Sequence, residues 1–421
     1  MLSSARIPIV NVVSQHVEDA AVLRNTRTHL VSGPHVKLLQ LGRLDERLAA
    51  HLDGIAVAGD FGAKLAAAAL ALPNVGAVFV TTIGEIGNKD VGGLDKLFAF
   101  AESLPEVQPG LISAFGWVST QALQDKGATL LSHQDPFRKR VVIAGCAMHR
   151  ADPGAVLDAA IASSDFLLRV QALRCAGELG RRDLLPICID HLKNKDPACA
   201  FWAASSSVLL GDRSRAVESL RQLALLAGPH RERALRAVLK LLTNQDAHGL
   251  LKALAQNPAD QRVLIRGTGI AGDPFYVPWL IKQMSDLKAS RLAGEAFSFI
   301  TGLDLAYLDL EQKPPENFES GPNDDPNDEN VAMDEDDGLP WPDPAKLQTW
   351  WSANSHRFQS GVRYFMGEPV SRAHCVKVLK EGYQRQRIAA AEYLCLLNPG
   401  TPLFNTSAPA WRQKRLLENM E

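Results

Sequence analysis

The segment at residues 164–180 reads SDFLLRVQALRCAGELG, and its pattern returns along the chain. Related segments open 30, 31, 33 and 31 residues apart, at Asp135, Asp165, Asp196, Pro229 and Asp260. A recurrence near 31 residues is typical of stacked-repeat proteins, because one helix pair cannot bury its own apolar face and must pack on its neighbours. The sequence therefore predicts a helical repeat protein.

The composition agrees with an all-α fold. Hydrophobic residues make up 46% of the 421 residues and aromatic residues only 6%, which suits close helix packing better than sheets. Asp-Pro pairs recur at the breaks, with Asp predicted as N-cap and Pro at the first helical position. Four glycines are predicted to end helices in the left-handed conformation: Gly87, Gly180, Gly211 and Gly272.

Arg169 and Ala172, followed by Gly177, Leu179 and Gly180, resemble the short form of the HEAT family. The resemblance covers residues 60–304 and is strongest at 135–272. It implies an all-α, right-handed α-solenoid of HEAT-like helix pairs with terminal caps. Arrays of that family mostly bind proteins, so the resemblance favours a protein partner.

The pattern divides the chain into four parts. We expect an N-terminal helical cap at 1–59, the HEAT-like array at 60–304, an acidic Pro-rich loop insertion at 305–345 and a C-terminal helical repeat and cap at 346–421. Apolar periodicity predicts individual helices at 12–31, 36–54, 344–358, 371–381 and 384–397. Residues 398–421 are expected to cap the far end of the array.

Three stretches resemble one uncharacterised family of proteobacterial proteins. They are GRLDERLAAHLDG at 42–54, DPNDENVAMD at 325–334 with LPWPDP at 339–344, and QRQRIAAA at 384–391. Members of that family are often encoded beside type VI secretion components. The resemblance implies an accessory or adaptor role, with a secretion component or an effector as the partner, and it transfers no catalytic residue.

The insertion is the leading candidate for a functional element. Residues 309–343 hold thirteen Asp or Glu and one Lys, a net charge of −12, whereas the whole chain carries −2. We expect an ordered arm whose carboxylates and indole contact a basic surface of this chain or of a partner, through Asp324, Asp325, Asp328, Glu329, Asp334 and Trp341.

Two other interpretations of the insertion stay open. A calcium site would use the carboxylates of Asp324, Asp325, Asp328, Glu329, Asp334, Asp336 and Asp337. The EF-hand pattern, however, lacks its glycine and its twelfth-position Glu. A solvated loop would use none of them.

Four arginines occupy similar places early in successive units: Arg140, Arg169, Arg233 and Arg262. One interpretation is a stabilising ladder in which they bond to Asp or to carbonyls of the adjacent turn. The other is a surface that binds a partner.

Nucleic acid is the alternative partner, with short basic clusters at 138–140, 181–182, 231–236 and 412–415. The clusters are short and few aromatic residues interleave with them, so this partner is disfavoured. We expect no enzyme and no cofactor or metal, because HExxH and GxSxG motifs are absent. GTGIAG at 267–272 lacks a βαβ context and is predicted to serve helix packing and a C-cap.

The six cysteines form no CxxC pair and sit among Ala and Leu, so they are predicted to be small buried hydrophobes. No apolar run is long enough for a membrane-spanning helix, and the N-terminus lacks a signal-peptide core. The sequence predicts a soluble protein of the reducing cytoplasm without a membrane segment, and it leaves the oligomeric state open.

Overall fold

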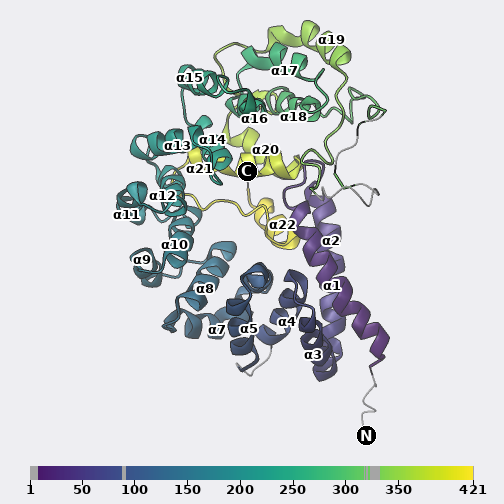
Figure 1. The fold of residues 1–421 in the computed structure, drawn as a ribbon, viewed down its shortest axis with the longest axis vertical. Helices are drawn as coiled ribbons and strands as arrows, with labels where there is room; N and C mark the ends of the chain where they lie inside the picture. The colour runs from purple at the N-terminus through teal and green to yellow at the C-terminus, as the bar shows by residue number, and fades with distance from the viewer. Residues whose placement is uncertain (1–7, 88–91, 317, 319–320, 323–331, 421) are drawn as a thin grey trace. The chain divides into compact units, whose positions relative to one another are not determined.

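The computed structural model describes residues 8–87, 92–316, 318, 321–322 and 332–420. It is mostly helical, which confirms the predicted all-α class (Figure 1). The chain forms two compact units, one of Met1–His191 with Pro399–Glu421 and the other of Leu192–Asn398.

The first unit holds the N-terminal helices and the last helix of the chain. Its helices are α1 (Val10–Leu30), α2 (Leu38–Val57), α3 (Gly59–Ala68), α4 (Val75–Gly87), α5 (Gly92–Ser103), α6 (Gln108–Trp117), α7 (Thr120–Ser132), α8 (Pro136–His149), α9 (Ala155–Ile161), α10 (Phe166–Leu179), α11 (Leu185–Asp190) and α22 (Ala410–Glu418), with short 3-10 turns between some of them. The two helices predicted in the N-terminal cap correspond to α1 and α2.

Within this unit α4, α6, α8 and α10 contact one another in succession, and α5, α7 and α9 flank them (Figure 1). The first residues of α4, α6, α8 and α10 lie 28 to 33 positions apart, close to the recurrence in the sequence. Small residues permit the close approach: a Cβ added at Gly110 would lie 2.3 Å from the carbonyl oxygen of Val75. Large buried side chains such as Phe79, Phe98 and Phe115 fill the core.

The C-terminal residues 399–420 pack inside this first unit, so the expectation that they cap the far end of the array is wrong. Helix α22 contacts α2, and the Ala410 amide donates to Asp45 at 2.7 Å. Arg412 donates to the carbonyls of Gly116, Trp117 and Val118, where α6 ends. Helix ends leave carbonyls unpaired, and this segment supplies their donors, which a local apolar pattern cannot reveal.

The second unit holds the other helices and one short hairpin. Its helices are α12 (Pro197–Leu210), α13 (Arg215–Leu225), α14 (Arg231–Leu239), α15 (Asn244–Leu254), α16 (Gln261–Ala271), α17 (Val277–Gln283), α18 (Ser290–Thr301), α19 (Pro344–Asn354), α20 (Arg372–Glu381) and α21 (Gln384–Leu397). Strands β1 (Tyr364–Phe365) and β2 (Glu368–Pro369) pair antiparallel. The three helices predicted after the insertion correspond to α19, α20 and α21.

In this unit α12, α14, α16 and α18 contact one another in succession, and their first residues lie 29 to 34 positions apart. The glycines of GTGIAG serve packing and capping, as predicted. A Cβ at Gly269 would lie 2.8 Å from the Cα of Ala296 in α18. Gly272 ends α16 at φ +71°, and its carbonyl accepts a hydrogen bond from the Tyr364 amide.

The predicted helix ends are largely confirmed. Side chains of Asp135, Asp165, Asp196 and Asp273 accept hydrogen bonds from backbone amides at helix starts. Gly180 and Gly211 close α10 and α12 in the left-handed conformation. Gly87 differs, because it is the last residue of α4 and is not among the glycines with positive φ.

The cysteines are free thiols, and all but the half-buried Cys146 are buried, as predicted. Burial raises the pKa of Cys188 to about 12 and that of Cys375 to about 11. Among the described residues no single helix has the length and apolarity to cross a membrane. The bent pair Leu38–Val57 and Gly59–Ala71 has the required length and apolarity only when its two segments are counted together.

Candidate functional site

The two ends of the acidic insertion lie side by side on the second unit. The Gln312 amide donates to the carbonyl of Trp341 at 2.8 Å, and the Asp343 amide donates to the carbonyl of Leu310 at 2.9 Å. Asp343 then caps α19 by accepting hydrogen bonds from two of its first amides. The insertion therefore leaves and rejoins the helical unit at one place.

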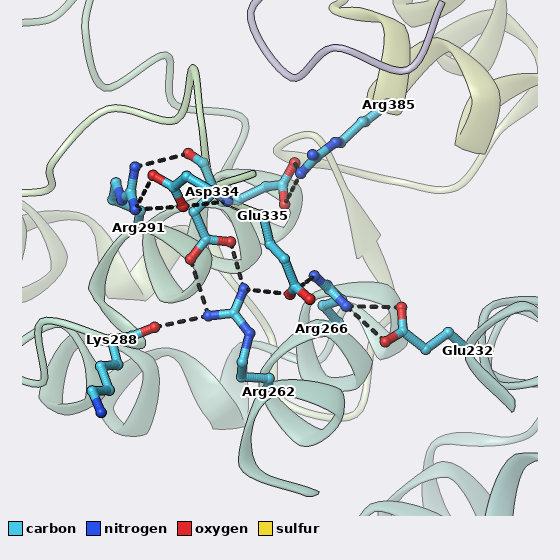
Figure 2. Close-up of polar contacts among 10 residues, drawn as sticks. Glu232, Arg262, Arg266, Lys288, Arg291, Asp334, Glu335 and Arg385 are labelled. Carbon is cyan, nitrogen blue, oxygen red and sulfur yellow. Dashed lines mark hydrogen bonds and ion pairs between the residues drawn. The ribbon is translucent and has the colours of Figure 1, made fainter. Parts of the chain in front are cut away.

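Two arginines bind the carboxylates on the returning end of the insertion (Figure 2). Arg262 of α16 donates to both oxygens of Asp336, at 2.6 and 3.0 Å. Arg291 of α18 lies 2.7 Å from one oxygen of Asp334 and donates to the other at 2.9 Å. Arg262 offers two nitrogens to the two oxygens of its carboxylate, and such paired, charged hydrogen bonds are among the strong ones.

A third arginine lies at the exposed margin. Arg266 donates to both oxygens of Glu232 at 2.8 Å and lies 3.5 Å from Glu335. Glu335 is also 3.2 Å from Arg262, but its side chain is 69% exposed. Solvent screens such pairs, so this margin contributes little stability.

A tight turn presents the two inner carboxylates. The Asp336 amide donates to the side chain of Asp334 at 3.0 Å, and the Asp337 amide donates to the Asp334 carbonyl at 3.2 Å. Asp336 is buried, and Arg291, also buried, donates to its carbonyl at 3.1 Å. The turn and the arginines therefore hold each other in one geometry.

Aromatic rings form the floor beneath Arg291. Its guanidinium carbon lies 4.7 Å from the ring centroid of Trp341 and 5.8 Å from that of Phe318. The two rings meet edge to face, with centroids 5.0 Å apart. Pro342 packs on Gly294, where an added Cβ would lie 3.2 Å from the proline ring. Arg291 is thus stabilised by an indole face as well as by the carboxylate of Asp334.

The charges in this cluster alternate. Hydrogen bonds to Asp336 hold the pKa of Arg262 above its ordinary value. Burial raises the pKa of Glu295, and Arg385, which donates to both of its oxygens at 3.0 Å, opposes that shift. Arginine does not release its proton near neutral pH, so this arrangement holds charge in place and is poorly suited to proton transfer.

The structure brings together Arg262, Asp334 and Trp341 among the residues expected from the sequence. The other ladder arginines lie elsewhere: in the first unit Arg140 donates to the side chain of Gln108 at 2.5 Å, and Arg169 donates to the carbonyl of Ser163 at 2.7 Å. Arg233 is an exposed residue of α14. Four further expected residues lie outside the described part of the chain: Asp324, Asp325, Asp328 and Glu329.

The sequence reasoning missed Arg291 and Arg266. Arg291 follows Arg262 by about one repeat length, so the repeat register itself could have identified it. Asp336 was one of the acids of the predicted arm and a candidate calcium ligand, and the structure shows its carboxylate bound by Arg262. Within the described residues, no group of three or more His, Cys, Asp or Glu is arranged to hold a metal ion.

Fold and site together define a mostly helical protein that holds the ends of an acidic insertion on its own arginines. Comparison with protein-family models, with curated proteins and with solved structures finds no match to this chain. The resemblance to HEAT arrays and to a family encoded near type VI secretion components therefore stays a prediction.

Proposed function

We propose that this protein is a non-enzymatic scaffold or adaptor that binds a protein partner through its acidic insertion. The observation that carries the proposal is the anchoring of the insertion by Arg262 and Arg291, with Trp341 buried beneath Arg291. Residues 313–331 between the anchored ends carry six carboxylates and one lysine. A basic surface on a protein partner would complement them in charge.

A nucleic-acid-binding array is the second candidate and has less support. Arginines of the candidate basic clusters are engaged by carboxylates: Arg138 with Asp95, Arg181 with Asp152, Arg231 with Asp260 and Arg236 with Glu392. Arg412 donates to backbone carbonyls. Phosphates would have to displace these partners, which weakens the case for a continuous phosphate-binding groove.

The helices that contact one another in succession form one row in each unit: α4, α6, α8 and α10 in the first, and α12, α14, α16 and α18 in the second. We also propose that these rows are built as a right-handed α-solenoid of HEAT-like pairs. The regular spacing of the row helices, close to the recurrence in the sequence, supports this proposal. A cytoplasmic location draws support from the free cysteines. An accessory role in type VI secretion or effector loading rests on the resemblance alone.

The experiment is affinity purification from the native cell with mass spectrometry, followed by direct titration of the captured partner. The test variant replaces Asp324, Asp325, Asp328 and Glu329 by their amides. We expect the partner captured by the intact protein to be lost, and the titration to show binding weakened at least tenfold.

The matched control neutralises four exposed carboxylates elsewhere: Asp60, Glu102, Glu106 and Glu381. It should capture the same partner as the intact protein. Equal loss of the captured partner in both variants would show that capture depends on the net charge of the protein and not on the insertion. Unchanged capture by the test variant would overturn the role of the insertion, and copurifying nucleic acid with steep salt dependence would favour the second candidate.

A further inference from the structure

A cavity of about 560 Å³ lies in the second unit against α15, α16 and the start of α17. Its volume falls within the usual range for ligand pockets, roughly 300–1,000 Å³. Apolar and aromatic side chains dominate the lining, which includes Leu251, Lys252, Leu264, Phe275, Tyr276 and Trp279.

The cavity is separate from the arginine–carboxylate cluster although both use α16. Leu264 lines the cavity, and it lies midway in sequence between Arg262 and Arg266, which bind the insertion. Residues two positions apart on an α-helix point to nearly opposite sides. The cavity and the anchored insertion therefore use different faces of this helix.

Phe275, Tyr276 and Trp279 form an aromatic wall of the cavity that is exposed at Phe275 and half-buried at the other two rings. Phe275 is 63% exposed. Its ring centroid lies 5.3 Å from those of both Tyr276 and His248. Beneath them the buried carboxylate of Asp273 accepts hydrogen bonds from the Phe275 amide at 2.9 Å and from His248 at 3.0 Å. The wall needs little ordering when it binds, which favours affinity.

A lysine supplies the charged side chain of the cavity lining. Lys252 lines it and is exposed, one helical turn after His248 on α15. The nearby carboxylate of Asp273 is buried and bound to His248 and Asn244. An anionic group at the margin would therefore meet Lys252, whereas a cationic ligand would be repelled by it.

We propose that this cavity binds a partner segment in which an aromatic side chain stands beside a carboxylate. The aromatic ring would pack among Phe275, Tyr276 and Trp279, and the carboxylate would pair with Lys252. This inference rests on the proposed protein-binding function and assigns it a second contact apart from the insertion. An exposed, rigid aromatic wall suits a side chain of a bound segment, since aromatic residues dominate the binding energy of protein interfaces.

The test uses three blocked peptides with a fluorescent label, titrated against the full chain by anisotropy. Their central residues are Asp-Trp-Asp, Asn-Trp-Asn and Asp-Ala-Asp. We expect the first to bind at least tenfold more tightly than either of the others. Phe275→Ala should weaken binding of the first peptide about tenfold, and Lys252→Gln should reduce its affinity to that of the Asn peptide.

Lys282→Gln is the matched control, because Lys282 is an exposed residue of α17 that does not line the cavity. Phe275 is exposed, so its substitution should leave the fold intact, which circular dichroism checks. Equal affinity for all three peptides, or no response to either cavity variant, would overturn the inference. N-acetyl-tryptophan binding as tightly as the peptide would also overturn it in favour of a small-molecule site.

The experiments distinguish failure of the insertion proposal from failure of the cavity proposal. The variant with four neutralised insertion carboxylates keeps the cavity, so it should bind the Asp-Trp-Asp peptide like the intact protein. Loss of peptide binding in that variant would contradict an independent cavity site. Retained peptide binding with unchanged partner capture would contradict the insertion proposal alone.

Discussion

The guanidinium of Arg291 lies over the indole of Trp341, with 4.7 Å between its central carbon and the ring centroid. The same side chain binds the carboxylate of Asp334 and the carbonyl of Asp336. Arg291 belongs to α18, and its three partners belong to the returning end of the insertion. One buried arginine therefore joins a helix to a segment that is distant from it in the chain.

Replacing this arginine should loosen the insertion. Arg291→Ala leaves Asp334 without its cation and uncovers the face of Trp341, so we expect the free energy of unfolding to fall by about 3 kcal/mol. Arg291→Lys should cost less, because lysine keeps the charge but loses the planar fork. Urea denaturation followed by tryptophan fluorescence measures both.

Arg221→Ala is the control for these variants. The Arg221 side chain is 42% exposed and lies 4.0 Å from Glu218, so its removal should change stability by less than about 0.5 kcal/mol. Equal effects of the Arg291 and Arg221 substitutions would contradict the anchoring role of Arg291.

The pair Arg262–Asp336 should show strong energetic coupling. Asp336 is buried and accepts two hydrogen bonds from Arg262, so a double-mutant cycle with Arg262→Gln and Asp336→Asn should give about 1–3 kcal/mol of coupling. The exposed pair Arg266–Glu335, at 3.5 Å, should give less than about 0.5 kcal/mol. A larger value for the exposed pair would show that the insertion docks differently.

Gly269 should be intolerant of a side chain. Gly269→Val places atoms against the Cα of Ala296, which a Cβ alone would approach to 2.8 Å, and should cost about 1–3 kcal/mol by separating α16 from α18. Gly249→Ala in α15 is the control, because a Cβ added at Gly249 meets nothing within 4 Å. This substitution should stabilise the helix by about 0.5–1 kcal/mol. Thermal unfolding midpoints that move in the same direction would contradict this packing.

The first unit should lose stability in acid through His149. Burial lowers its pKa to about 4, and Arg412 adds to that shift. Between about pH 6.5 and 4 the unfolded state binds more protons than the folded state, so the free energy of unfolding should fall by about 2–3 kcal/mol as the pH is lowered.

His149→Gln keeps a donor for the Phe115 carbonyl and should flatten the stability profile over this range. His35→Gln, at an exposed position, should leave it unchanged. A second fall in the free energy of unfolding is expected at lower pH, where Glu178 takes up a proton. Burial opposes its charge, but Arg174 and Arg150 outweigh burial and hold its pKa below the ordinary value. An unchanged profile in His149→Gln would show that another group titrates.

Much of the helical pattern could be read from the sequence because it depends on neighbours a few residues apart. Asp135, Asp165 and Asp196 cap helices through amides two or three positions away, and Gly180 ends a helix through its own φ. The charge of the insertion was also visible, since composition alone reveals it.

The candidate site was only partly predictable. Arg262 and Trp341 could be singled out by register and composition, but the contact of Arg262 with Asp336 spans 74 residues. Nothing in a local pattern says which carboxylate returns to which arginine. The same holds for the C-terminal segment, whose Arg412 donates to the carbonyl of Gly116, far earlier in the chain.

The sequence by itself determined the helices, their caps and the acidity of the insertion, because propensity, capping and charge act over a few residues. Only the tertiary structure decided that Asp334 and Asp336 lie on Arg291 and Arg262, and that residues 399–420 pack in the first unit. Such contacts depend on which distant groups are left unpaired and buried together, and that is a property of the whole packed chain.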